Sequence, residues 1–174
     1  MIQKWSRYRL LELFFDFPRK PYLIRELSRK CRLAQTAVRI HIKALQAEWL
    51  IKKDNTGLYA SYRAFRDNSL FKLLKTQNVV LRIHQSGLVQ FLEKSLFPGC
   101  IILFGSASRG EDTEESDIDL FVQASQTSLD LHKFERTLNR RINILYEPQL
   151  EELSPELLNN LANGIVLYGY LKVV

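Results

Sequence analysis

Two aspartates separated by one residue, Asp117 and Asp119, are the side chains in this sequence best suited to hold a metal ion. They lie in the segment Ser116-Asp-Ile-Asp-Leu-Phe-Val122, whose alternating pattern predicts a strand with both carboxylates on one face. Two neighbouring carboxylates repel each other, and a divalent cation relieves that repulsion. Because Mg²⁺ prefers oxygen ligands, we predict a magnesium site at Asp117 and Asp119.

A phosphate-binding turn is predicted upstream of this strand. The apolar run Cys100–Phe104 predicts a buried strand that leads directly into Gly105-Ser106. Glycine at a strand end allows the backbone to approach a phosphate closely, and the serine hydroxyl and exposed amides supply donors. Arg109 adds a fixed positive charge nearby. Phosphate donors on one element and metal ligands on the next together predict binding of a metal–nucleoside triphosphate.

The order of these residues resembles a known signature. The run Phe104-Gly-Ser-Ala-Ser-Arg-Gly-Glu, a four-residue spacer and Ser116-Asp-Ile-Asp-Leu are similar to the DNA polymerase beta-like nucleotidyltransferase superfamily, particularly its minimal nucleotidyltransferases. The similarity covers about residues 88–170 and includes Asn163–Gly169, which resembles the last strand of these domains. Minimal nucleotidyltransferases are small prokaryotic domains, often encoded beside a HEPN-type partner, and some act as antitoxins that adenylylate it.

The resemblance assigns a role to each residue of the signature. It implies that Gly105 and Ser106 hold the triphosphate of an NTP, with ATP expected as substrate or ligand. It implies that Asp117 and Asp119 bind Mg²⁺ or Mn²⁺ as catalytic metal ligands. Arg109 and Ser116 are then secondary candidates for contacts with the phosphates.

The third carboxylate of the family pattern is absent. The segment Arg141–Tyr146 is the predicted next strand, and its matching position is Asn143. Asparagine offers a metal a carbonyl oxygen but does not serve as a general base, and loss of a general base costs about 10²- to 10⁴-fold in rate. Glu147 shares the strand face of Asn143, but it lies where the strand ends at Pro148. The residues therefore support nucleotide binding better than nucleotide transfer.

The elements that position these residues predict a small α/β domain with a mixed sheet over residues 98–174. A helix is expected at Thr127–Arg141, with Leu131, Phe134 and Leu138 facing inward. Residues 67–97 are expected to form a helical connector that breaks at Ser86-Gly87, with Ser86 capping its second helix. Four leucines of this connector fall near heptad spacing, namely Leu70, Leu74, Leu81 and Leu88. They are expected either to form a homodimer interface through residues 69–97 or to pack the two domains against each other.

The N-terminal part predicts a winged helix-turn-helix over residues 1–66, which makes the whole chain α+β. Helices are expected up to Phe17, at Tyr22–Lys30 and at Gln35–Ala47, followed by a hairpin with strands at Leu50–Lys53 and Leu58–Arg63. Helix, helix, turn, helix and hairpin is the order of a winged helix. Most of residues 8–64 resemble archaeal and bacterial winged-helix regulators.

The charge distribution favours double-stranded DNA as a partner of this domain. Residues 1–78 hold 17 Lys+Arg against 6 Asp+Glu, whereas residues 79–174 hold 8 against 13. The third helix and the wing supply the predicted DNA-binding side chains, which are Gln35, Thr36, Arg39, Lys43, Lys52, Lys53 and Arg63. The alternatives are a solvated basic face and a domain that binds only proteins.

Several function classes remain open at this point, and others are disfavoured. Two distant cysteines argue against a disulfide framework or zinc site, and no signal peptide or membrane span is evident, so a cytoplasmic protein without membrane contact is expected. The leading hypothesis is a DNA-binding regulator whose nucleotidyltransferase domain transfers AMP to a protein acceptor. The alternatives are a nucleotide-sensing transcription factor with an inactive domain and a pure protein-interaction module.

Overall fold

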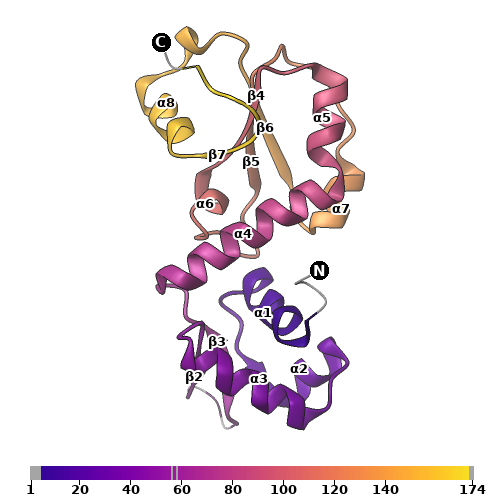
Figure 1. The fold of residues 1–174 in the computed structure, drawn as a ribbon, viewed down its shortest axis with the longest axis vertical. Coiled ribbons are helices and arrows are strands. Elements are labelled where there is room, and N and C mark those ends of the chain that lie inside the picture. Colours follow the sequence, from indigo (N-terminus) through magenta and orange to yellow (C-terminus); the bar gives the residue numbers. More distant parts are fainter. Residues whose placement is uncertain (1–4, 56, 58, 173–174) are drawn as a thin grey trace. The chain divides into compact units, whose positions relative to one another are not determined.

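The computed structural model describes residues 5–55, 57 and 59–172. The chain forms two compact units, Met1–Lys75 and Thr76–Val174, and the boundary falls inside helix α4 (Ser69–Ser86) (Figure 1). Two predicted positions, Thr56 in the hairpin turn and Leu58 at the start of a strand, lie outside the described residues.

The N-terminal unit contains the three predicted helices and the predicted hairpin. Its elements before α4 are α1 (Ser6–Asp16), β1 (Tyr22–Leu23), α2 (Ile24–Cys31), α3 (Gln35–Ala47), β2 (Ile51–Asp54) and β3 (Ser61–Ala64). The bounds of α3 are those predicted. The apolar residues at helical spacing on α2 and α3 are all buried, namely Ile24, Leu27, Val38, Ile42 and Leu45.

The second predicted helix begins two residues later than expected. Tyr22 and Leu23 form β1 instead, which pairs antiparallel with Tyr62 and Ser61 of β3 and gives a three-stranded sheet in the order β1-β3-β2. Tyr22 is fully buried, and its hydroxyl donates to the carbonyl of Leu13 at 3.3 Å. The partner strand lies about 40 residues downstream, so the local pattern around Tyr22 carries no sign of it.

The C-terminal unit follows the predicted order of strands, with additional elements. After α4 come α5 (Leu88–Leu96), β4 (Cys100–Phe104), α6 (Gly105–Ser108), β5 (Ile118–Val122), α7 (His132–Leu138), β6 (Ile142–Tyr146), η2 (Leu150–Glu152), α8 (Pro155–Ala162) and β7 (Ile165–Gly169). The predicted break between α4 and α5 is confirmed. Gly87 there has φ +81°, and the amide of Leu88 donates to the hydroxyl of Ser86.

The sheet of this unit is mixed, as predicted. Its strand order is β6-β5-β4-β7, with β5 and β6 parallel and the other pairs antiparallel. Helices α5 and α7 lie over one face and α8 over the other (Figure 1). On the first face Ile118, Leu120 and Val122 of β5 are buried, whereas Phe121 packs on the second face. Asp119 has the same strand parity as Phe121 and therefore lies on the face covered by α8.

The helix predicted at Thr127–Arg141 is much shorter in the structure. It spans His132–Leu138, because Asp130 accepts the amide of His132 at its start and Asn139 adopts a left-handed conformation (φ 55°) at its end. Its predicted inward residues Phe134 and Leu138 are buried. Helix α8 was not predicted.

The predicted connector contributes to both hydrophobic cores. Phe71 of α4 packs in the core of the N-terminal unit, whereas Ile83 of α4 and Leu88 and Leu92 of α5 pack in the core of the C-terminal unit. Among the described residues, no helix is both long and apolar enough to cross a membrane.

Candidate functional site

Asp119 lies where three predicted motif segments meet. In the sheet register it is opposite Phe104 of β4 on one side and opposite Asn143 of β6 on the other. Phe104 is the last residue of β4, so the Gly105-Ser106 turn that follows it lies next to the carboxylate of Asp119. The side chain of Asp119 is only partly buried, between the buried residues Ile118 and Leu120. The site therefore forms at the strand ends, with its carboxylate open to solvent.

Gly105 approaches Asp119 so closely that a side chain at this position would displace the carboxylate. A Cβ atom added at Gly105 would lie 2.6 Å from Oδ2 of Asp119, and the glycine has φ +71°. Any L side chain at this position is both strained and in collision with the carboxylate. The glycine predicted to allow close approach to a phosphate is thus also the residue that lets the turn pack against Asp119.

Asn143 makes a direct hydrogen bond to the same carboxylate. Its Nδ2 donates to Oδ1 of Asp119 at 3.1 Å, and the asparagine itself is exposed. The position predicted from the strand pattern is therefore beside Asp119. An amide donor holds the aspartate in place without the repulsion that a third carboxylate would bring.

Asp117 precedes β5 and is exposed. It lines a broad open groove of about 1120 Å³ together with Glu114, Glu115, Ser116, Asp130, His132, Glu135, Arg136, Asn139, Arg140 and Arg141. Asp117 lies one residue before β5, and the groove it lines includes His132, Glu135 and Arg136 of α7. That Asp117 and Asp119 share one face stays a prediction.

The remaining predicted phosphate contacts have partners within the chain. Nε of Arg109 donates to Oε2 of Glu111 at 3.1 Å, and both side chains are about half exposed. The hydroxyl of Ser116 accepts the amide of Thr113 at 2.9 Å, which closes the turn before Asp117. The carbonyl of Ser106 accepts the amides of Arg109 and Glu111. Arg109 can leave its surface partner for a phosphate at little cost, because exposed ion pairs contribute at most about 1 kcal/mol.

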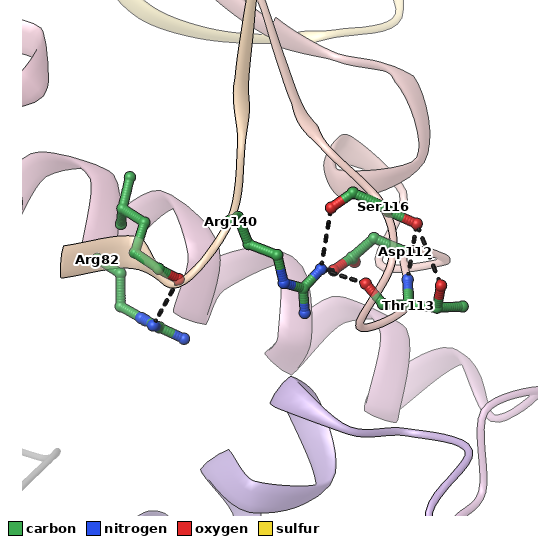
Figure 2. Close-up of polar contacts among 6 residues, drawn as sticks. Arg82, Asp112, Thr113, Ser116 and Arg140 are labelled. Carbon is green, nitrogen blue, oxygen red and sulfur yellow. Dashed lines mark hydrogen bonds and ion pairs between the residues drawn. The ribbon is translucent and has the colours of Figure 1, made fainter. Parts of the chain in front are cut away.

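Arg140 was missed in the sequence analysis, although it anchors the spacer between the two motifs. Its guanidinium donates to Oδ2 of Asp112 at 3.2 Å and to the carbonyls of Thr113 and Ser116 (Figure 2). The side chains of Arg140 and Asp112 are only 12% and 7% exposed. Arg140 is therefore a positioning residue, since it fixes the turn that leads into Asp117.

A second arginine fixes the segment that carries Arg140. Arg82 of α4 donates to the carbonyl of Leu138 at 3.0 Å, at the end of α7 (Figure 2). The sequence gives little sign of either contact, because the partners are far away along the chain. The partner of Arg82 lies 56 positions away, and those of Arg140 lie 24 to 28 positions away.

Two neighbouring side chains carry oxygens of the kind that a divalent cation prefers. Asp119 presents a carboxylate that contacts the Gly105 turn and Asn143, and Asn143 carries a neutral amide oxygen. Across the described part of the chain, no group of three or more His, Cys, Asp or Glu residues is arranged to hold a metal.

The residues predicted to bind DNA fall into two groups on the N-terminal unit. On α3, Gln35, Thr36, Arg39 and Lys43 are all exposed, as is Ile40 at 64%. Gln35 and Arg39 line a hollow that also includes Arg25, Tyr59 and Tyr62.

The wing residues are divided. Lys53 is exposed on β2, whereas Lys52 and Arg63 line a different hollow with Arg19 and Arg66. The structure thus does not gather all predicted DNA-binding side chains on one surface.

The C-terminal unit combines a mixed four-stranded sheet with a glycine-serine turn that lies beside the strand carboxylate of Asp119. Residues 87–170 match the family model described as "Polymerase beta, Nucleotidyltransferase". The C-terminal unit therefore contains a nucleotidyltransferase domain. No curated protein matched the chain.

Proposed function

We propose that this chain is a DNA-binding transcriptional regulator whose nucleotidyltransferase domain binds a magnesium–nucleoside triphosphate. The observation that carries the nucleotide part is the convergence of Gly105 and Asn143 on the carboxylate of Asp119. The same three positions were expected to act together from their order in the sequence.

In this proposal Asp117 and Asp119 hold the cation, Mg²⁺ or Mn²⁺, and Asn143 offers its carbonyl oxygen. The cation would neutralise charge on the phosphate oxygens. Gly105 and Ser106 contact the triphosphate through the amides that open α6, and Arg109 exchanges Glu111 for a phosphate. ATP is the proposed nucleotide.

The proposed reaction is transfer of AMP from ATP to a hydroxyl of a protein acceptor. The hydroxyl oxygen forms a bond to the α-phosphorus, the bond from that phosphorus to the bridging oxygen breaks, and pyrophosphate leaves. The hydroxyl proton passes to water, because Asn143 is no base. We propose a HEPN-type protein as the acceptor, which makes this chain antitoxin-like.

Incubation of the full chain with labelled ATP, Mg²⁺ and the product of the neighbouring gene tests transfer. Label on the acceptor with the wild-type chain, and none with Asp119→Asn, supports it. Absence of label from every acceptor with a folded, nucleotide-binding protein argues against it.

A second function is favoured by Asn143 itself. Because its amide donates to Asp119 where the family pattern has a carboxylate, the domain is suited to bind a nucleotide without turning it over. The chain would then be a nucleotide-sensing transcription factor. Operator affinity that changes with Mg·ATP, without product formation, distinguishes this function from transfer.

DNA binding is supported by the N-terminal unit. Three helices, a hairpin and the additional strand β1 have the order of a winged helix-turn-helix, and α3 presents exposed polar and cationic side chains. Exposed Ile40 adds an apolar contact of the kind that reads a thymine methyl. A chain that binds neither duplex DNA at low salt nor nucleotide would instead be a protein-interaction module.

A homodimer through residues 69–97 is also part of the proposal. Of the four predicted leucines, Leu70 and Leu81 are each more than 40% exposed. Leu74 instead packs against the N-terminal core and Leu88 is buried, so the exposed leucines of α4 are Leu70, Leu81 and the unpredicted Leu73. Sedimentation of the wild-type chain and of Leu81→Arg tests it. A monomeric wild-type chain at micromolar concentration would contradict the dimer.

A further inference from the structure

Four cationic side chains share one small hollow on the N-terminal unit. The hollow has a volume of about 240 Å³, and its lining comprises Arg19, Lys52, Arg63 and Arg66 with Pro18, Ala64 and Asp67. Asp67 is the single carboxylate among these residues, so positive charge dominates. Electrostatics alone makes the hollow attractive to an anion.

The hollow lies on the opposite side of the hairpin from the hollow that contains Gln35 and Arg39. Lys52 is directly opposite Arg63 in the β2–β3 register, and directly opposed residues project to the same side. The next pair, Lys53 and Tyr62, projects to the other side. Tyr62 lines the hollow with Gln35 and Arg39, so the two hollows are separate surfaces.

The arrangement costs folding energy. Like charges directly opposed across two strands destabilise a sheet. No carboxylate among the described residues forms an ion pair with Lys52, Arg63 or Arg66, and the ammonium of Lys52 lies 4.7 Å from the ring centre of Phe65. Arg19 has an interaction of its own, so the electrostatic argument rests on Lys52, Arg63 and Arg66. A bound anion would offset this repulsion.

We propose that this hollow binds a phosphate group. Guanidinium groups match the oxygens of a phosphate with paired hydrogen bonds, and lysine adds a point charge. The volume holds a tetrahedral anion with part of its hydration shell. The phosphate belongs either to the DNA backbone flanking the site read by α3 or to a free phosphate compound. The DNA source rests on the proposed function, whereas phosphate binding itself does not.

Titration of the full chain with inorganic phosphate at low ionic strength tests the proposal first. Arginine side-chain NMR signals are followed in the wild-type chain, in Arg63→Gln and in Arg29→Gln, an exposed cation of α2 that does not line the hollow. We expect saturable shifts of the Arg66 signal in the wild-type chain and in Arg29→Gln, with at least tenfold weaker binding in Arg63→Gln. The melting temperature of Arg63→Gln should be unchanged or higher, because the substitution removes repulsion. Equal or absent shifts in all three proteins would overturn the proposal.

The salt dependence of DNA binding then identifies the source of the phosphate. For a backbone phosphate, the slope of log affinity against log salt should fall by about one unit in Arg63→Gln relative to the wild-type chain. Arg29→Gln serves as the control for loss of one charge. A slope equal to that of the control, with inorganic phosphate binding lost only in Arg63→Gln, assigns the site to a free phosphate compound. If DNA binding is absent altogether, the phosphate titration still decides the proposal.

Discussion

Replacement of Asn143 by aspartate restores the carboxylate that the family pattern expects, at a position whose environment is known. The wild-type amide donates to Oδ1 of Asp119 at 3.1 Å. In Asn143→Asp this hydrogen bond becomes a contact between two carboxylates. The variant therefore tests whether this pair of positions is a metal site, independently of any acceptor.

The expected effect without metal is destabilisation. Loss of a hydrogen bond to a charged group on this exposed surface costs about 1 kcal/mol. Repulsion between two carboxylates at such a separation adds roughly 1 kcal/mol in a water-like environment. The sum of about 2 kcal/mol lowers the melting temperature of a domain of this size by roughly 10 °C. Mg²⁺ should reverse most of this loss, because a cation between the carboxylates replaces repulsion with attraction.

Thermal melts in EDTA and in Mg²⁺ measure the effect, with Asn159→Asp as a control for the same chemical change at an exposed position that has no hydrogen bond to Asp119 among the described contacts. If AMP transfer occurs, Asn143→Asp should also raise its rate by about 10²- to 10⁴-fold. A melting temperature that falls equally in EDTA and Mg²⁺, or does not change, would refute the assignment of these positions to a metal site.

Three further predictions concern the turn, the spacer and a histidine of α3. In Gly105→Ala the added Cβ would collide with Oδ2 of Asp119, so we expect at least tenfold weaker Mg·ATP binding by calorimetry. Gly87→Ala is the control for backbone strain alone, because Gly87 has a similar positive φ but open space around it. Removal of the buried partner of Asp112 in Arg140→Met should lower the free energy of unfolding by about 3 kcal/mol in denaturant melts, and a loss under 1 kcal/mol would contradict the anchoring role. Burial, and secondarily Arg7, lowers the pKa of His41 below its ordinary value of 6.5. The stability that this shift contributes is therefore present above pH 6.5 and is lost as the pH falls through the lowered pKa. Melting temperatures of the wild-type chain should fall more steeply below pH 6.5 than those of His41→Gln, and parallel curves would contradict this.

The strand-borne part of the site was predictable because it depends on local periodicity. Alternation placed Asp119 on the face opposite to Ile118 and Leu120, and the same parity in the next strand led to Asn143. The structure places these two residues in contact. The neighbouring Gly105 was expected to permit a close approach, although its nearest neighbour in the structure is Asp119.

Elements that depend on distant partners were not predictable from the local pattern. Strand β1 forms because Tyr22 pairs with β3. Arg140 holds the spacer in place because Asp112, 28 residues earlier in the chain, folds back against its guanidinium. Helix α7 is shorter than the predicted Thr127–Arg141, because Asp130 accepts the amide of His132 at its start. Long-range pairing and local side-chain caps override the periodic signal in each case.

Calorimetric titration of Mg·ATP into the wild-type chain and into Asp119→Asn tests the nucleotide site most directly. Glu151→Gln, an exposed carboxylate in η2, is the control. The account predicts saturable, magnesium-dependent binding to the wild-type chain and to Glu151→Gln, reduced at least tenfold in Asp119→Asn. Binding of equal strength in all three proteins, or binding that EDTA leaves unchanged, would contradict a site built around Asp119.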